Sequence, residues 1–315
     1  MSNIAKIAIG TWSWGVGGFA GGNVVFGNEL DTKDLKDVFN KAMENGLNLF
    51  DTAYAYANGE SERILGELIA QYDRKDVVIS DKFSPGMQND NAENPVLEML
   101  ETSLNKLGTD FIDIYWIHNS ADIERWTPYL VDVMESGKVG RIGVSNHNLE
   151  QVKRVQEILK PSGIQISAVQ NHFSLLYRES IESGLLDYCK ENEIQFFSYM
   201  VLEQGALSGK YNEKNLLPVN SNRGKTYNHL FPKLTELLNG LGDIAKKYEV
   251  SPAQVATAWA IGRGTTPILG LTKVEQIEDA VQSSNLNLTE DEIKHLESLA
   301  IASNVNTRGG WEGQA

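Results

Sequence analysis

The chain has 315 residues, of which 41% are hydrophobic, and it carries a formal net charge of −14 and a single cysteine. That length and hydrophobic content are enough for a large core, so we expect one domain over residues 1–315 with no internal linker. The excess of acidic residues argues against nucleic acid or an anionic membrane as a partner, and one cysteine cannot form an internal disulfide.

Short apolar runs alternate with helical patterns along the whole chain. The first strand is expected at Ile7–Gly10, and the first helix starts at an N-cap of Asp31 or Thr32 and stops at Gly46. Further strands are expected at Leu47–Asp51, Val77–Asp81, Phe111–Trp116, Arg141–Val144, Ile166–Gln170, Gln195–Tyr199 and Thr266–Gly270. Helices are expected between them at Glu60–Gln71, Glu93–Leu107, Thr127–Ser136, Leu149–Leu159, Arg178–Glu191 and Pro252–Ile261.

Eight strands separated by helices indicate an α/β fold of the (β/α)8 TIM barrel class. A further helix begins after the last strand, and the capping-box spacing from Thr289 to Glu292 predicts an extra C-terminal helix over Glu290–Ala300. The polar stretch Asn212–Thr226 interrupts the seventh unit, and we expect it at the mouth of the barrel.

Several patterns argue against other classes of site. Gly15, Gly17 and Ala20 spell GxGxxA, but the loop continues to about Asp31 instead of opening a dinucleotide-binding helix. The histidines lack metal-binding spacing, so no metal site is expected. Cys189 lies on the apolar side of a predicted helix, which favours a core residue over a nucleophile. No segment has the features of a secretory signal or a membrane span, which predicts a cytoplasmic location.

Four polar residues stand where predicted buried strands end. Asp51 and Tyr56 lie in FDTAYAY, Lys82 follows VVISD, and His118 ends DIYWIH. Because the carboxyl ends of barrel strands meet on one face, these side chains can converge although they lie far apart in sequence. Asp51, Tyr56 and His118 each have an ordinary alternative as a helix cap, a packed edge or a core histidine. Lys82 differs, because a buried lysine is rare unless it is paired, and Asp51 is its natural partner.

Together the four groups suit proton transfer to a carbonyl oxygen. Tyrosine alone is a weak acid with an ordinary pKa of about 10. We expect Lys82 and Asp51 to lower the pKa of Tyr56, and the His118 imidazole to position the substrate.

The motifs around these residues resemble those of the aldo-keto reductase family. The likeness rests on DxxxxY at Asp51 and Tyr56, the strand-end Lys82, DxYxxH at Asp113–His118, and GKVGRIGVSN at Gly137–Asn146. It continues through VQN at Gln170, SYMVLEQGALSGKY at Ser198–Tyr211, and ILGLTKVEQIEDA at Ile268–Ala280. These motifs follow the order of the family over nearly the whole chain.

The resemblance implies a nicotinamide dinucleotide as cofactor. Ser145, Asn146 and Gln170 would hydrogen-bond to the nicotinamide carboxamide, and Tyr199 would stack on the nicotinamide ring. The residues expected near the pyrophosphate are Leu202, Gln204 and Ser208, in a segment where Met200-Val201 replaces the usual Ser-Pro. The polar stretch at the mouth of the barrel would fold over the bound cofactor.

The adenine end decides between NADP and NAD. Thr272 and Lys273 place a hydroxyl and an ammonium where a 2′-phosphate could bind at a helix N-terminus. The other residues expected at this end are Gly270, Gln276 and Asp279. The hydroxyl and the ammonium favour NADP(H). NAD(H) is also possible, because the serine, arginine and asparagine that some family members have at the positions of Leu271, Gln276 and Ala280 are absent here. A solvated lysine is the alternative for Lys273.

A cluster of aromatic residues at strand ends predicts a pocket for an apolar, cyclic or aromatic carbonyl compound. These residues are Trp12, Trp14, Tyr54, Phe83 and Trp116. The resemblance thus implies an NADP-dependent oxidoreductase that reduces aldehydes or ketones to alcohols. Some proteins similar to this family are instead slow-turnover, nucleotide-sensing regulatory subunits of a channel or transporter, and this alternative stays open. The sequence leaves the oligomeric state undetermined.

Overall fold

Eight parallel strands close into a barrel in chain order, β1-β2-β3-β4-β5-β6-β7-β8, in the computed structural model, which describes residues 6–309. The strands are β1 Ala8–Gly10, β2 Leu49–Asp51, β3 Val78–Phe83, β4 Ile112–Ile117, β5 Val139–Ser145, β6 Ala168–His172, β7 Gln195–Tyr199 and β8 Thr266–Leu269. The expected TIM barrel is therefore confirmed, with each expected strand at or within a few residues of its predicted place.

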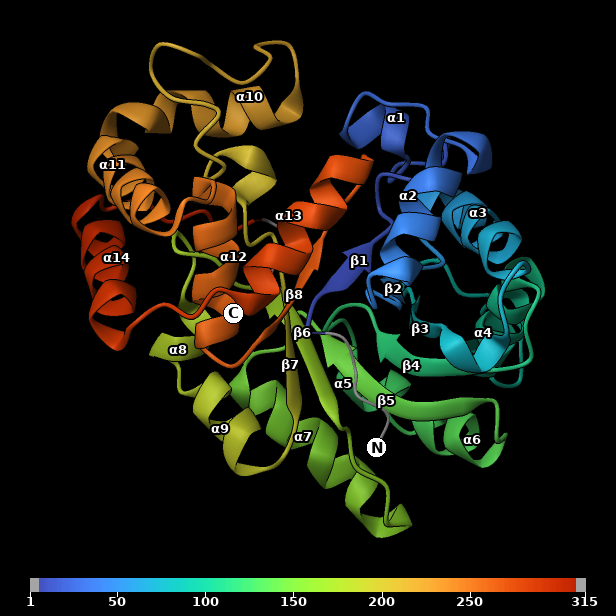
Figure 1. The fold of residues 1–315 in the computed structure, drawn as a ribbon. Helices are drawn as coiled ribbons and strands as arrows, with labels where there is room; N and C mark the ends of the chain where they lie inside the picture. The colour runs from blue at the N-terminus through green and yellow to red at the C-terminus, as the bar shows by residue number, and fades with distance from the viewer. Residues whose placement is uncertain (1–5, 310–315) are drawn as a thin grey trace.

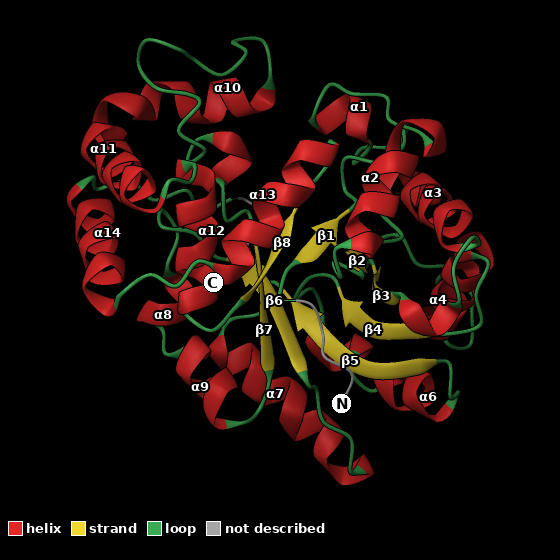
Figure 2. Ribbon diagram, viewed as in Figure 1, coloured by secondary structure: helices red, strands yellow, loops and turns green. Residues whose placement is uncertain are grey.

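Helices surround this barrel on the outside (Figure 2). They are α1 Gly22–Val25, α2 Thr32–Glu44, α3 Glu60–Ile69, α4 Pro95–Leu107, α5 Ile123–Trp126, α6 Tyr129–Glu135, α7 Leu149–Leu159, α8 Glu179–Glu182, α9 Leu185–Glu191, α10 Asn222–Tyr227, α11 Phe231–Tyr248, α12 Pro252–Gly262, α13 Val274–Asn285 and α14 Glu290–Ala302. Figure 1 shows α1, which follows β1, and α10, which follows β7, at the same end of the molecule.

Local sequence sets the ends of several helices. Asp31 caps α2 in a capping box with Asp34, and Thr289 caps the expected C-terminal helix α14 in the same way. The helix expected over Arg178–Glu191 is divided into α8 and α9, because Gly184 adopts a left-handed conformation with φ of 78°.

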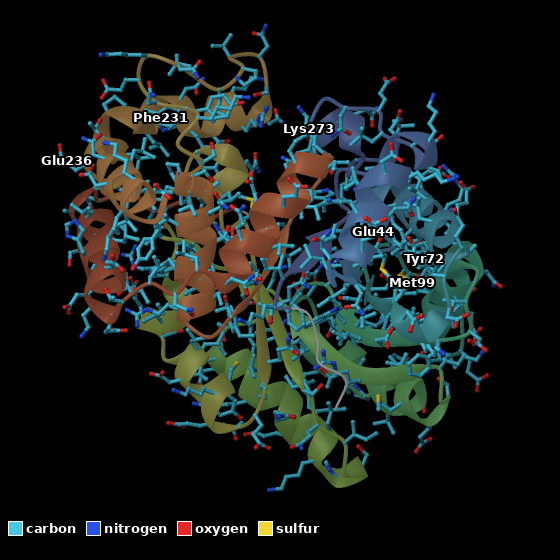
Figure 3. The ribbon with its side chains drawn as sticks, in the orientation of Figure 1. Glu44, Tyr72, Met99, Phe231, Glu236 and Lys273 are labelled. Atoms are coloured by element: carbon cyan, nitrogen blue, oxygen red, sulfur yellow. The ribbon has the colours of Figure 1, made fainter. Side chains whose placement is uncertain are left out.

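The longest helix of the described chain, α11, was not expected from the sequence. Its glycines suggest a loop, yet Gly240 lies where α11 packs against α14, and a Cβ there would come within 2.4 Å of Leu299. The helix is amphipathic, with Phe231 buried in the core and Glu236 exposed (Figure 3). Tertiary packing thus overrides the helix-breaking tendency of glycine in this helix.

Side chains alternate between the inside and the outside of each strand, and this alternation positions the site. In β3, Ser80 and Lys82 contact Asp51 within the barrel, whereas Phe83 packs on the other side against Trp126. The barrel interior below the site is filled by a separate buried cluster, which consists of Ala8, Leu49, Ile114, Trp116, Ala168 and Phe197.

Within residues 6–309, no group of three or more His, Cys, Asp or Glu side chains is arranged to hold a metal ion. None of the helices in the same range has both the length and the apolar character needed to cross a bilayer.

Candidate active site

The four strand-end residues converge around the Lys82 ammonium. Lys82 Nζ donates to Asp51 Oδ2 at 2.6 Å, to the Thr52 carbonyl oxygen at 2.6 Å, and to Tyr56 Oη at 3.4 Å. Its three protons are therefore directed at a carboxylate, a backbone carbonyl and a phenol. His118 completes the group, because its ring meets the Tyr56 ring edge-on with centroids 5.7 Å apart.

Burial controls the acidity of the central pair. Although burial disfavours the ammonium, the charge of Asp51 raises the pKa of the fully buried Lys82. Burial also raises the pKa of the Tyr56 phenol, while the Lys82 charge lowers it and the Asp51 charge raises it. The pKa of Tyr56 is thus raised overall, so the expectation that Lys82 and Asp51 lower it is wrong for the described protein, in which burial outweighs the Lys82 charge. The Asp51 carboxylate acts by holding Lys82 beside the phenol.

His118 is a neutral imidazole in this setting. Burial, with a smaller contribution from the Lys82 charge, lowers the pKa of His118 to about 3. Its Nδ1 lies 3.2 Å from the Ser84 hydroxyl. An uncharged ring beside the phenol can orient a carbonyl oxygen by hydrogen bonding without competing with Tyr56 as the acid.

The residues expected at the nicotinamide lie at adjacent strand ends and interact with the four strand-end residues. Asn146, with φ of 61°, donates from Nδ2 to the His118 carbonyl oxygen at 2.9 Å and also contacts Ser145 Oγ. Tyr199 Oη donates to Asn146 Oδ1 at 2.5 Å. Gln170 donates from Nε2 to Asp51 Oδ1 at 3.0 Å. The structure thus brings Ser145, Asn146, Gln170 and Tyr199 next to the four strand-end residues.

The segment after β7, expected near the pyrophosphate, has an unusual backbone. Met200, Glu203 and Gln204 have positive φ values of 60°, 47° and 52°, a conformation that is costly for residues with a Cβ. Leu202 and Ser208 lie partly buried in the same turn, where the Ser208 hydroxyl donates to the Gly205 carbonyl oxygen at 2.6 Å.

Sequence reasoning missed the buried carboxylate that supports this turn. Glu203 is fully buried and receives hydrogen bonds from Tyr227 Oη at 2.7 Å and Thr307 Oγ1 at 2.8 Å, as well as from the Ser174 hydroxyl. His172 Nε2 lies 2.8 Å from the same carboxylate, and its ring stacks on Tyr199. An acidic residue inside the apolar stretch MVLEQGAL was the available signal.

Of the residues expected at the adenine end, Lys273 stands at the N-terminus of α13 (Figure 3). Lys273 is exposed there, and Gln276 caps the helix by accepting from the backbone N–H groups of Thr272 at 2.8 Å and Lys273 at 3.0 Å. Gly270 and Asp279 are exposed nearby in sequence. An ammonium at a helix N-terminus is a suitable binding group for a phosphate.

The expected aromatic pocket is only partly assembled. Trp12 is partly exposed and stacks on Tyr56 with centroids 5.9 Å apart, and Tyr54 is partly exposed near the Lys106 ammonium. The structure does not bring the other three rings to the mouth of the site. Trp14, Phe83 and Trp116 are fully buried, because they occupy core positions of the chain rather than its loop-facing surface.

The sequence and the fold match known proteins. The model of the Aldo/keto reductase family matches residues 6–301. A chloroplastic pyridoxal reductase of Arabidopsis thaliana is 32% identical, over 95% of this chain and 84% of its own length. A putative aryl-alcohol dehydrogenase of Schizosaccharomyces pombe is 32% identical, over 82% of this chain and 90% of its own length.

Solved structures share the fold at lower identity. A glycerol dehydrogenase from Gluconobacter oxydans superposes with a TM-score of 0.79 and 23% identity, covering 98% of this chain and 94% of that one. A thermostable aldo-keto reductase in complex with the inhibitor epalrestat gives a TM-score of 0.73 and 23% identity, covering 94% of this chain and 95% of that one. At this identity the likeness shows the barrel fold.

Proposed function

Because the chain belongs to the aldo/keto reductase family, whose members are nicotinamide-dependent carbonyl oxidoreductases, we propose that it reduces an aldehyde or ketone with Tyr56 as the proton donor. The observation that carries the proposal is the chain of contacts from Asp51 through Lys82 to Tyr56, at 2.6 and 3.4 Å. It places a fixed positive charge beside the phenol, whose ring meets that of His118 edge-on.

Each of the four residues has a separate task. Tyr56 gives its phenolic proton to the carbonyl oxygen, and the Lys82 charge stabilises the phenolate that remains. Asp51 holds the ammonium in place by accepting one of its protons. His118, kept neutral by burial, orients the carbonyl oxygen toward Tyr56.

The donor set at the strand ends fits a nicotinamide dinucleotide. When bound, the dinucleotide supplies the hydride for the carbonyl carbon. Asn146 and Gln170 carry amides suited to the carboxamide, and the Tyr199 ring suits stacking on a flat heterocycle, which contributes on the order of 1 kcal/mol. The turn Met200–Gly205 and Ser208 would contact the pyrophosphate, with Leu202 and Gln204 in that turn.

We further propose a preference for NADP(H) over NAD(H). An exposed ammonium at Lys273 and the hydroxyl of Thr272 stand at the N-terminus of α13, where the helix dipole also favours a phosphate. The 2′-phosphate is the group that distinguishes the two dinucleotides, and a charge-assisted contact is typically worth about 1.5–3 kcal/mol.

The partly exposed aromatic rings support a proposal for the substrate class. Trp12 lies against Tyr56, so an aromatic or cyclic carbonyl compound could stack beside the donor. The names of two relatives point the same way, since one is a pyridoxal reductase and the other a putative aryl-alcohol dehydrogenase. Benzaldehydes and pyridoxal are therefore the first substrates to test.

The test is a screen of aromatic and aliphatic aldehydes, ketones and quinones, with the loss of NADPH absorbance as the readout. The proposal predicts turnover of at least one aromatic aldehyde, at a higher kcat/KM than an aliphatic aldehyde of similar size. Absence of turnover with every carbonyl, despite NADPH binding, would contradict the proposal and favour a nucleotide-sensing regulatory subunit.

A further inference from the structure

The barrel interior directly below the four strand-end residues holds a buried tryptophan. Trp116 of β4 is fully buried and pairs in register with Lys82 of β3. Its ring meets Phe197 edge-on at 5.2 Å. Gly143 of β5 makes room for it, because a Cβ there would lie 2.5 Å from the Trp116 ring. An apolar ring alone would fill this space without the cost of burying an N–H group.

The buried N–H group starts a chain of hydrogen bonds with a fixed direction. Trp116 Nε1 lies 2.6 Å from Ser80 Oγ, and an indole nitrogen can only donate. Ser80 must therefore accept that bond, and its own proton points to Asp51 Oδ1 at 2.6 Å. The opposite orientation of the hydroxyl would leave two donors facing each other and Asp51 without this partner.

The chain ends on the carboxylate that holds Lys82. Asp51 Oδ1 also accepts from Gln170, while Oδ2 accepts from Lys82 Nζ at 2.6 Å. Donors on one oxygen fix the rotation of the carboxylate, so its other oxygen stays aimed at the ammonium. All of these groups are at least nine-tenths buried, where such bonds are strong and a missing partner is costly.

We propose that Trp116 and Ser80 are positioning residues for carbonyl reduction, which fix the orientation of Asp51 and through it the Lys82 ammonium beside Tyr56. This role rests on the proposed function, whereas the hydrogen-bond chain itself does not. It also gives Trp116 a task other than lining the substrate pocket.

The variants separate the N–H and the hydroxyl from the bulk of the side chains. Trp116→Phe keeps a ring but removes the donor, Ser80→Ala removes the hydroxyl, and Ser80→Thr keeps it. Trp259→Phe is the matched control, because Trp259 is also fully buried and donates to Glu297 at 3.1 Å on the outer helices.

The first readout needs no cofactor or substrate. In the ¹⁵N-labelled protein, the indole N–H resonance that disappears in Trp116→Phe belongs to Trp116. We expect this resonance to move upfield and to exchange faster with solvent in Ser80→Ala, to move also in Asp51→Asn, and to be restored in Ser80→Thr. A resonance that is unaffected by both Ser80→Ala and Asp51→Asn overturns the chain, whatever the activity.

The second readout is the pH profile of carbonyl reduction with NADPH. We expect Trp116→Phe and Ser80→Ala to lower kcat roughly three- to tenfold, which corresponds to the loss of about one hydrogen bond. KM should stay within about twofold of the parent value. The part of the pH profile that reflects ionisation of Tyr56 should move to higher pH, because a displaced Lys82 stabilises the phenolate less. The other charges facing the phenol, those of Asp51 and Asp81, and the neutral His118 are retained in Trp116→Phe and Ser80→Ala.

The outcomes distinguish the inference from the proposed function. Parent-like kcat and pH profiles in both variants, with the indole resonance displaced as expected, overturn the positioning role and leave Trp116 and Ser80 as core residues. A similar loss in Trp259→Phe also overturns it. If the parent reduces no carbonyl at all, the proposed function fails, and the resonance still tests the hydrogen-bond chain. If Ser80→Ala does not fold, Trp116→Phe and Asp51→Asn provide both readouts.

Discussion

Two carboxyl groups are buried together, one of them next to Lys82 in the chain, and their titration is predicted to change stability. Glu62 of α3 and Asp81 of β3 are both fully buried and interact directly, with Ser103 beside them. Burial raises the pKa of Asp81 to about 6, from an ordinary value of 3.8, and raises the pKa of Glu62 well above its usual range. We therefore expect this pair to keep a proton at higher pH than ordinary carboxyl groups do.

The direction in which pH changes stability follows from the raised pKa values in the folded state. A raised pKa stabilises the folded protein below the unfolded-state value near 3.8, and this stability is lost as the pH rises through about 6. The difference between 3.8 and about 6 corresponds to roughly 3 kcal/mol of unfolding free energy. Asp81→Asn keeps the shape and the acceptor for the Lys82 N–H but does not titrate.

The assay is equilibrium unfolding in denaturant at several pH values between about 4 and 7. The unfolding free energy of the parent minus that of Asp81→Asn should fall by roughly 2 kcal/mol over this range, because part of the full difference is already lost at pH 4. The control is Asp37→Asn on the exposed face of α2, for which the difference should stay nearly constant. A constant difference for Asp81→Asn as well would refute the raised pKa of Asp81.

Three further predictions concern cofactor choice, the thiol and the barrel interior. Lys273→Ala should weaken NADPH binding roughly ten- to a hundredfold and NADH binding much less, and equal losses in titrations would contradict the assignment of the adenine end. Cys189 is buried, which raises the pKa of its thiol to about 12, so thiol reagents should label the folded protein slowly and leave activity intact; fast labelling with inactivation would refute a core role. Gly143→Ala should lower stability by about 1–3 kcal/mol in thermal or denaturant unfolding because its Cβ meets Trp116, whereas Gly242→Ala, with open space around it in α11, should not.

The barrel could be predicted from sequence because its signals are local. Each buried strand is a short apolar run, and the helices carry caps such as Asp31 and Thr289 that mark their starts. Helix α11 could not be predicted in this way, since the glycine at 240 is explained only by its contact with Leu299 of another helix. Local signals do not contain that contact.

The same distinction applies to the candidate site. The convergence of Asp51, Tyr56, Lys82 and His118 was expected, because strand ends of a barrel share one face. The burial of Trp116 was not expected, because the sequence pattern around a strand-end tryptophan is the same whether its ring faces the mouth or the interior of the barrel. Interactions such as that of Glu62 with Asp81 join residues of different elements and become visible only in three dimensions.

The central claim is that Tyr56 donates the proton while the cofactor binds independently of it. The most direct test compares Tyr56→Phe with Tyr54→Phe, which removes a hydroxyl two residues away, in kcat for the best carbonyl substrate and in the dissociation constant for NADPH. We expect that Tyr56→Phe lowers kcat by about 10²–10⁴-fold with nearly unchanged NADPH binding, and that Tyr54→Phe retains most activity. Near-parent kcat in Tyr56→Phe would contradict it.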